Sequence, residues 1–202
     1  VGRGFRLLVA IADVSHYVTP GTAIDKEAYS RATSVYLVDR VIPMLPEKLS
    51  NNICSLVPHQ DRLVFSAIFE MDEEGKVHKE WFGKSVIHSD RRFTYEEAQE
   101  VIEDRLDEYK AEIHTLNKIA LALRNERFRK GAVAFETQEV KFILDENKKP
   151  VGLYVKERKA AHMLIEDLML LANRKVAEFM SKVQPPVPFV FRVHDFPDMD
   201  RL

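Results

Sequence analysis

One long segment, residues 156–181, constrains the fold more than any other part of the chain, because its apolar residues recur at helical spacing. Those on one broad face are Ala161, Leu164, Ile165, Leu168, Leu171, Ala172, Val176 and Phe179. Met163 and Leu170 fall together on the other side. The pattern predicts a helix that is covered from two directions.

A polar stripe runs along the same predicted helix. His162, Glu166 and Asn173 lie at positions i, i+4 and i+11. On a helix buried on two sides, such groups are satisfied internally or by a ligand. The alternative is a solvated strip with an ordinary surface ion pair, and the pattern alone leaves both interpretations open. Asp167, about 100° around the axis from Glu166, is predicted to be solvated or to lie in the N-terminal turn.

The other segments predict shorter elements. Strands are expected at 5–14, 62–71, 76–88, 132–135, 140–144, 151–155 and 189–193, and helices at 22–33 and 94–130. The first run has few polar interruptions, which is typical of a strand covered on both faces. Without repeats or a linker, these elements predict one α+β unit, with a twisted mixed or antiparallel sheet flanked by helices.

Local signals place some boundaries. The loop 72–75 ends in a glycine and indicates a hairpin. Thr94, with Glu97 three residues later, predicts a capping box. The helical pattern that follows is one long helix or two in series, ended by Gly131.

Composition limits the partners. The chain has 30 basic and 32 acidic residues, so its net charge of -2 offers no general attraction to a polyanion. Nucleic acid would have to be bound by a local patch or by stacking. The single cysteine, Cys54, has no disulfide partner within the chain; we expect a buried inert thiol and a reducing, cytoplasmic location. No run approaches the roughly 20 apolar residues of a membrane span.

Metal and hydrolase motifs are weak. The segment HDFPDMD, residues 194–200, gathers one histidine and three aspartates, but its Pro-Asp pair favours a helix start over a metal site. Asp13 and His16 are interpreted as the polar end of a strand. The chain contains no glycine-rich phosphate loop, GxSxG elbow or HExxH motif.

Three aromatic residues remain of interest: Tyr36, Tyr95 and Phe135. Each alone is more often a core residue, yet stacking on aromatic rings holds unpaired bases without a large positive charge. Tyr36 lies in the segment 33–56, which two prolines and an Asn-Asn turn interrupt. We expect a rigid loop whose apolar residues mostly pack inward while Tyr36 faces outward.

A long series of segments resembles the ribonuclease II/ribonuclease R family catalytic (RNB) domain, nearest to its bacterial ribonuclease R branch. The series begins with VAIADVSHYVTPGTAIDKEAYSRATSVYLVDRVIPMLPEKLSNNICSL at residues 9–56. It continues through DRLVFSAIFEMDEEGKV, SDRRFTYEEAQEVIE, AFETQEVKF, AHMLIEDLMLLAN and FRVHDFPD. The resemblance covers essentially the whole chain.

The resemblance implies a processive, Mg²⁺-dependent 3′-to-5′ exoribonuclease that acts on single-stranded RNA and releases nucleoside 5′-monophosphates. It implies that Tyr36 stacks on the terminal nucleotide beside the scissile phosphate, which makes it the expected catalytic position. Phe135 would close the opposite end of the base stack. Tyr95 and Glu166 would contact RNA near its 3′ end.

Two parts of the family pattern are missing. The aspartate cluster that binds Mg²⁺ would precede residue 1, and an arginine-bearing segment would follow Leu202. We therefore expect residues 1–202 to be one partial catalytic domain with no metal ligands of its own, inactive as a nuclease in isolation and prone to non-physiological self-association. The alternative is a catalytically inactive RNA-binding or regulatory relative.

Overall fold

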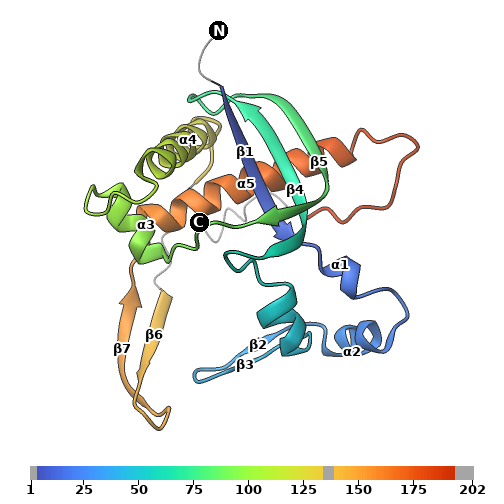
Figure 1. Ribbon diagram of the computed structural model, residues 1–202, viewed down its shortest axis with the longest axis vertical. Helices are drawn as coiled ribbons and strands as arrows, with labels where there is room; N and C mark the ends of the chain where they lie inside the picture. Colours follow the sequence, from blue (N-terminus) through green and yellow to red (C-terminus); the bar gives the residue numbers. More distant parts are fainter. Residues whose placement is uncertain (1–3, 134–138, 194–202) are drawn as a thin grey trace, which may run out of the picture.

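The computed structural model describes residues 4–133 and 139–193. A three-stranded antiparallel sheet lies at its centre, with the strands in the order β1, β4, β5 (Figure 1). These strands span Phe5–Ala12, Asp61–Met71 and Val77–His88. The helix α5, Ala160–Met180, runs across one face of this sheet. The predicted α+β architecture is confirmed.

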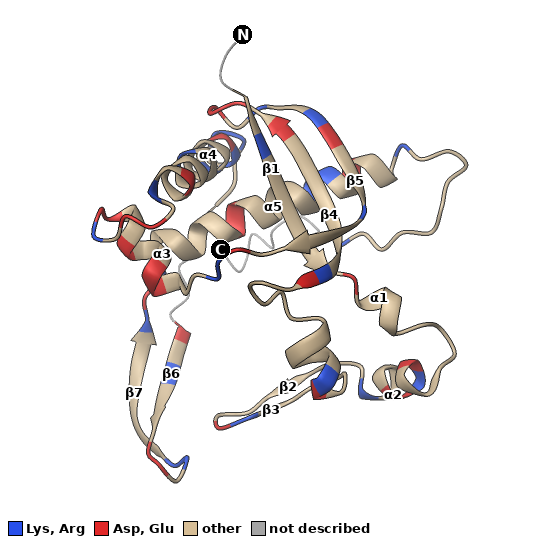
Figure 2. Ribbon diagram, in the orientation of Figure 1, with Lys and Arg blue, Asp and Glu red and all other residues tan. Residues whose placement is uncertain are grey.

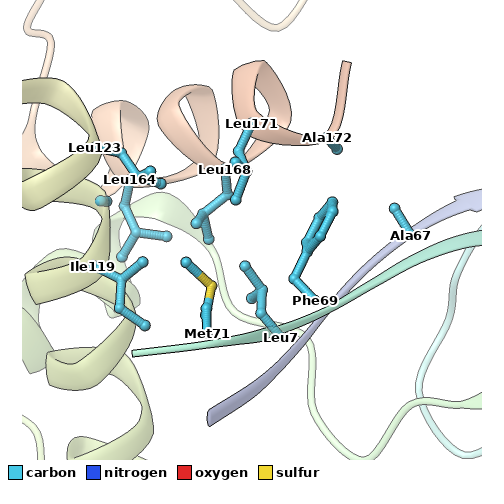
Figure 3. Packing of buried hydrophobic residues seen from close by; sticks show 11 residues of the cluster. Leu7, Ala67, Phe69, Met71, Ile119, Leu123, Leu164, Leu168, Leu171 and Ala172 are labelled. Atoms are coloured by element: carbon cyan, nitrogen blue, oxygen red, sulfur yellow. The ribbon is translucent and has the colours of Figure 1, made fainter. Parts of the chain in front are cut away.

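The core lies between this face of the sheet, α5 and the helix α4, Lys110–Arg129 (Figure 3). The labelled side chains are Leu7, Ala67, Phe69, Met71, Ile119, Leu123, Leu164, Leu168, Leu171 and Ala172. Burying each large apolar side chain contributes roughly 1.5–3 kcal/mol. This packing fixes α4 and α5 against the sheet and so sets the positions of their polar residues.

The segment that dominated the sequence pattern forms α5, as predicted. It begins at Ala160 because Lys156 still belongs to the strand β7, Pro150–Lys156. Its buried apolar residues are Ala161, Leu164, Leu168, Leu171 and Ala172. The predicted cover on its second side is wrong for the described part of the chain, where Leu170 is exposed.

The local signals are confirmed. Thr94 caps α3, Tyr95–Ile102, and its Oγ1 accepts a hydrogen bond from the Glu97 N–H (3.1 Å) while Glu97 Oε2 accepts one from the Thr94 N–H (2.7 Å). The helical pattern forms two helices, because Asp104 and Tyr109 adopt positive φ angles between α3 and α4. Gly131, with φ 95°, follows the end of α4.

Two antiparallel ribbons extend from this core (Figure 1). One pairs β2, Val35–Tyr36, with β3, Val41–Ile42. It lies near the short helices α1, Val14–Tyr17, and α2, Ala23–Arg31, and precedes a π-helical turn, Lys48–Ile53. The other pairs β6, Glu139–Leu144, with β7. Within the described ranges, no helix is long and apolar enough to cross a membrane.

The inward packing expected for segment 33–56 is wrong. The apolar residues of the β2–β3 ribbon are exposed, namely Val35, Leu37, Val38, Val41 and Ile42. The reason is that this ribbon projects from the core and no described strand joins it. Leu49 of the π-helical turn is the buried residue of this segment among those the structure describes.

Three strand predictions also differ from the structure. The strand β1 is not covered on both faces: Leu7 faces the core, whereas Leu8, on the opposite face, and Ile11, near the end of the strand, are exposed. Residues 189–193 form no strand, since no described strand lies beside them to supply hydrogen bonds. The same is true of Ala132 and Val133, and the rest of that predicted strand lies outside the described residues.

Candidate nucleic-acid interface

Two of the predicted RNA-contacting residues, Tyr95 and Glu166, both lie by the N-terminal half of α5, Tyr95 through its contact with His162. Tyr95 is the first residue of α3, and its ring stacks on the ring of His162 with a centroid distance of 4.2 Å and an interplanar angle of 14°. Tyr95 remains 44% exposed. Glu166 follows His162 by one helical turn.

The junction between α3 and α5 is fixed by a buried amide. Gln99 is almost fully buried, and its Oε1 accepts a hydrogen bond from the backbone N–H of Ala161 (3.1 Å). Its Nε2 donates to Glu103 Oε1 at 2.7 Å. Because the first N–H groups of a helix lack partners within the helix, this bond satisfies α5 and docks α3 on it at once. The junction therefore sets how Tyr95 meets His162.

Glu166 is held by arginines from two segments. Arg158, in the loop before α5, donates a hydrogen bond to Glu166 Oε2, and Arg127 of α4 lies 4.0 Å from Glu166 Oε1. Arg127 also pairs with Asp167 at 3.0 Å. Glu166 is thus not a free carboxylate, but an exposed member of an ion-pair network.

Asp167 is the buried member of that network. It is only 3% exposed, and Arg124 donates to its Oδ2 through Nε (2.8 Å) and a terminal nitrogen (2.6 Å). The prediction of a solvated or N-terminal-turn carboxylate is wrong, because α4 packs over this side of α5 and brings two arginines with it. A buried carboxylate needs such partners to offset the loss of hydration.

The ion-pair network has a positive formal charge. Three arginines face two carboxylates, which gives a formal charge of +1 in a chain whose net charge is -2. Elsewhere acidic and basic residues alternate along α2, α4 and the β4–β5 hairpin (Figure 2). The aromatic stack itself lies on an acidic element, because α3 carries Glu96, Glu97 and Glu100 and no basic residue (Figure 2), so contact with nucleic acid at this place would depend on stacking more than on charge.

The polar stripe on α5 is therefore satisfied in two ways. His162 and Glu166 have protein partners, whereas Asn173 is exposed, as an ordinary solvated residue would be. The interpretation of internally satisfied groups thus holds for His162 and Glu166, and the interpretation of a solvated strip holds for Asn173. The arginines were not predicted as site residues, although Arg124 and Arg127 at i, i+3 share a helix face.

Tyr36 lies apart from this cluster, on the β2–β3 ribbon. It is 79% exposed. Its side chain is therefore open to a ligand, but the structure brings it into no stack with Tyr95. Phe135, like residues 194–200 with their histidine and aspartates, lies outside the described residues.

Asp13 forms the polar strand end that the sequence indicated. It accepts a hydrogen bond from Ser15 Oγ (2.5 Å) and pairs with Lys84 Nζ (2.9 Å). These two partners, Ser15 first, hold the pKa of the Asp13 carboxyl below its usual range. Nearby Cys54 is half-buried, and burial raises the pKa of its thiol, which disfavours a reactive thiolate.

The described residues include no group of three or more His, Cys, Asp or Glu side chains placed to hold a metal ion. The paired carboxylates Glu166 and Asp167 do not fit a Mg²⁺ site, because three guanidinium groups already neutralise them. The arrangement offers an exposed aromatic ring and arginine side chains, which are groups that stack on bases and pair with phosphates in proteins generally.

Comparisons with known proteins agree on one family. The sequence matches the family described as RNB domain over residues 2–202. Ribonuclease R of Thermotoga maritima is 44% identical over 204 aligned residues, covering 98% of this chain and 28% of that protein. The structure of Mycoplasma genitalium RNase R in complex with ribose methylated single-stranded RNA is similar, with a TM-score of 0.82 and 32% sequence identity. The match covers 88% of this chain and 28% of that one.

A more distant structure shares the fold alone. Yeast Ssd1, described as a pseudonuclease, superimposes with a TM-score of 0.70 at 18% identity, covering 89% of this chain and 22% of that one. The chain thus spans less than a third of the length of each of these relatives.

Proposed function

Because the chain belongs to the RNB domain family, we propose that it forms part of the catalytic domain of a 3′-to-5′ exoribonuclease that hydrolyses single-stranded RNA. The observation that carries this proposal is the 44% identity to a ribonuclease R over 98% of the chain. The likeness to ribonuclease R structures described as complexes with single-stranded and with double-stranded RNA supports RNA as the substrate. The expected place of action is the cytoplasm.

In this proposal, the 202 residues bind and orient the RNA. Tyr36 stacks on the terminal base, Phe135 closes the other end of the base stack, and Tyr95 and Glu166 hold the nucleotides near the 3′ end. The exposure of Tyr36 and Tyr95 supports roles in stacking. The arginine network supports contact with a negatively charged strand.

Residues 1–202 are then one partial domain, and we place the residues that bind Mg²⁺ in other parts of a longer protein. The metal would activate the water nucleophile and stabilise charge on the phosphate. The residues described above would only position the strand. We therefore propose that the isolated chain has little or no nuclease activity.

A second candidate is a catalytically inactive RNA-binding relative. The observation in its favour is the shared fold with a protein described as a pseudonuclease, since a fold alone does not imply catalysis. The identity to that protein is only 18%, against 44% to a ribonuclease R. We therefore prefer the enzyme.

The test uses the chain alone and the chain extended on both sides to the length of its relatives. Both are incubated with single-stranded RNA, with Mg²⁺ or with EDTA. The proposal expects Mg²⁺-dependent release of nucleoside 5′-monophosphates by the extended protein and not by the 202 residues. Tight RNA binding by the extended protein without degradation would favour the inactive relative. Robust degradation by the 202 residues alone would contradict the proposal that the Mg²⁺ ligands lie outside them.

A further inference from the structure

His162 is a half-buried member of the polar stripe to which the proposed function gives no role. It lies in the first turn of α5, between the two proposed RNA-contacting residues. One face of its ring covers the Tyr95 ring in a nearly parallel stack. It is half-buried, so it is not an ordinary surface histidine.

A hydrogen bond fixes the orientation of the His162 ring. The backbone N–H of Lys159, the residue before α5, donates to Nδ1 of His162 (3.2 Å). An Nδ1 that accepts a hydrogen bond carries no proton, so the ring is the neutral tautomer with the proton on Nε2. Burial lowers the pKa of His162, with further lowering by Lys156 and Lys159 that Glu96 and Glu139 oppose.

Tyr95 needs such a support. As the first residue of α3, it has no preceding helical turn to restrict its side chain, and it is 44% exposed. A ring that rotates freely loses conformational entropy when it stacks on a base. The His162 ring occupies one face of Tyr95 and leaves the exposed part of the ring for a ligand.

We propose that His162 is a positioning residue, which holds the Tyr95 ring in the orientation that stacks on an RNA base. The inference rests on the proposed function of Tyr95. His162 touches no reacting atom in this account, and it acts through Tyr95.

Three substitutions separate the two contacts of His162. His162→Phe keeps a flat ring for Tyr95 and loses the acceptor for the Lys159 N–H. His162→Asn keeps a short side-chain acceptor and loses the ring. His162→Ala loses both contacts.

The measurement is the affinity of the extended protein for single-stranded RNA in EDTA, together with the thermal unfolding midpoint. The phenylalanine variant should bind RNA within about twofold of the wild type, and the asparagine and alanine variants on the order of three- to tenfold more weakly. The order of the unfolding midpoints should be different. The asparagine variant should be nearest to the wild type, because it keeps an acceptor for the Lys159 N–H, and the phenylalanine variant should be less stable. If affinity follows stability instead, the role of His162 is merely structural and the inference is wrong.

A double-variant cycle gives the control. In a Tyr95→Ala protein, His162→Ala should weaken RNA binding no further, because its effect passes through the missing ring. Additive losses would overturn the inference. If Tyr95→Ala weakens binding and His162→Ala does not, the inference alone fails; if Tyr95→Ala has no effect, the proposed function of Tyr95 fails with it.

Discussion

Arg124 of α4 donates two hydrogen bonds to one carboxylate oxygen of Asp167 on α5, at 2.8 and 2.6 Å. The carboxylate side chain is 2% exposed and the guanidinium side chain 15%. Together with the ion pairs of Arg127 to Asp167 and Glu166, this buried pair joins the two helices. It also links residues 43 positions apart in the chain.

Asp167→Asn should lower the free energy of unfolding by about 3 kcal/mol, because it leaves the buried Arg124 guanidinium without its counter-charge and Arg127 with Glu166 alone. Chemical denaturation measures this loss. The matched control is the double substitution Arg124→Met with Asp167→Leu, which should cost clearly less because it removes both members of the pair. Equal losses in the two proteins would contradict the account of the network.

Glu97 should titrate with a pKa of about 2, against an ordinary value of 4.5. The backbone N–H of Thr94 is the main cause, followed by Arg91 and the Thr94 side chain. A lowered pKa in the folded state means that the ionised carboxylate favours folding, so this contribution is complete above about pH 4.5 and is lost as the pH falls toward 2.

Carboxyl chemical shifts measured by NMR would check the pKa of Glu97 directly. Glu97→Gln should destabilise the protein at neutral pH, and the difference from the wild type should shrink as the pH falls through this window. A measured pKa near 4.5 would contradict the capping-box geometry.

Phe69 and Phe65 provide a matched pair on β4. Phe69 is fully buried in the core and Phe65 is 46% exposed. Phe69→Ala should cost about 3–5 kcal/mol of stability through the cavity it leaves, and Phe65→Ala about 1 kcal/mol or less. Urea denaturation of the two variants checks this, and similar losses would mean that the core lies elsewhere.

Local signals in the sequence predicted the local structure well. The periodicity of α5, the Thr94 capping box and the β4–β5 hairpin depend on residues close together in the chain. The errors concern pairings between distant segments. The exposed face of β1, the missing strand at 189–193 and the buried state of Asp167 depend on which element packs against them, and periodicity carries no such information.

The candidate site likewise contains some residues that the sequence indicated and others that only the packing of distant segments brings to it. The resemblance selected Tyr95 and Glu166, and the structure places them at the same end of α5. The arginines that hold Glu166 come from α4 and from the loop before α5. No spacing within the α5 sequence could have indicated them.

In the proposed function, this chain positions single-stranded RNA for an exoribonuclease, with Tyr36 beside the terminal nucleotide. Tyr29 of α2 is a matched control, since it is 88% exposed against 79% for Tyr36 and has no proposed contact with RNA. Each tyrosine is replaced by alanine in the extended protein. The substrate is single-stranded RNA labelled at its 5′ end, with Mg²⁺ present.

The most direct measurement is the length of the final labelled product and the rate at which it forms. We predict that Tyr36→Ala lengthens this product or slows its formation, while Tyr29→Ala matches the wild type. An unchanged product and rate for Tyr36→Ala would contradict the account, because the ribbon that carries Tyr36 would then not position the RNA.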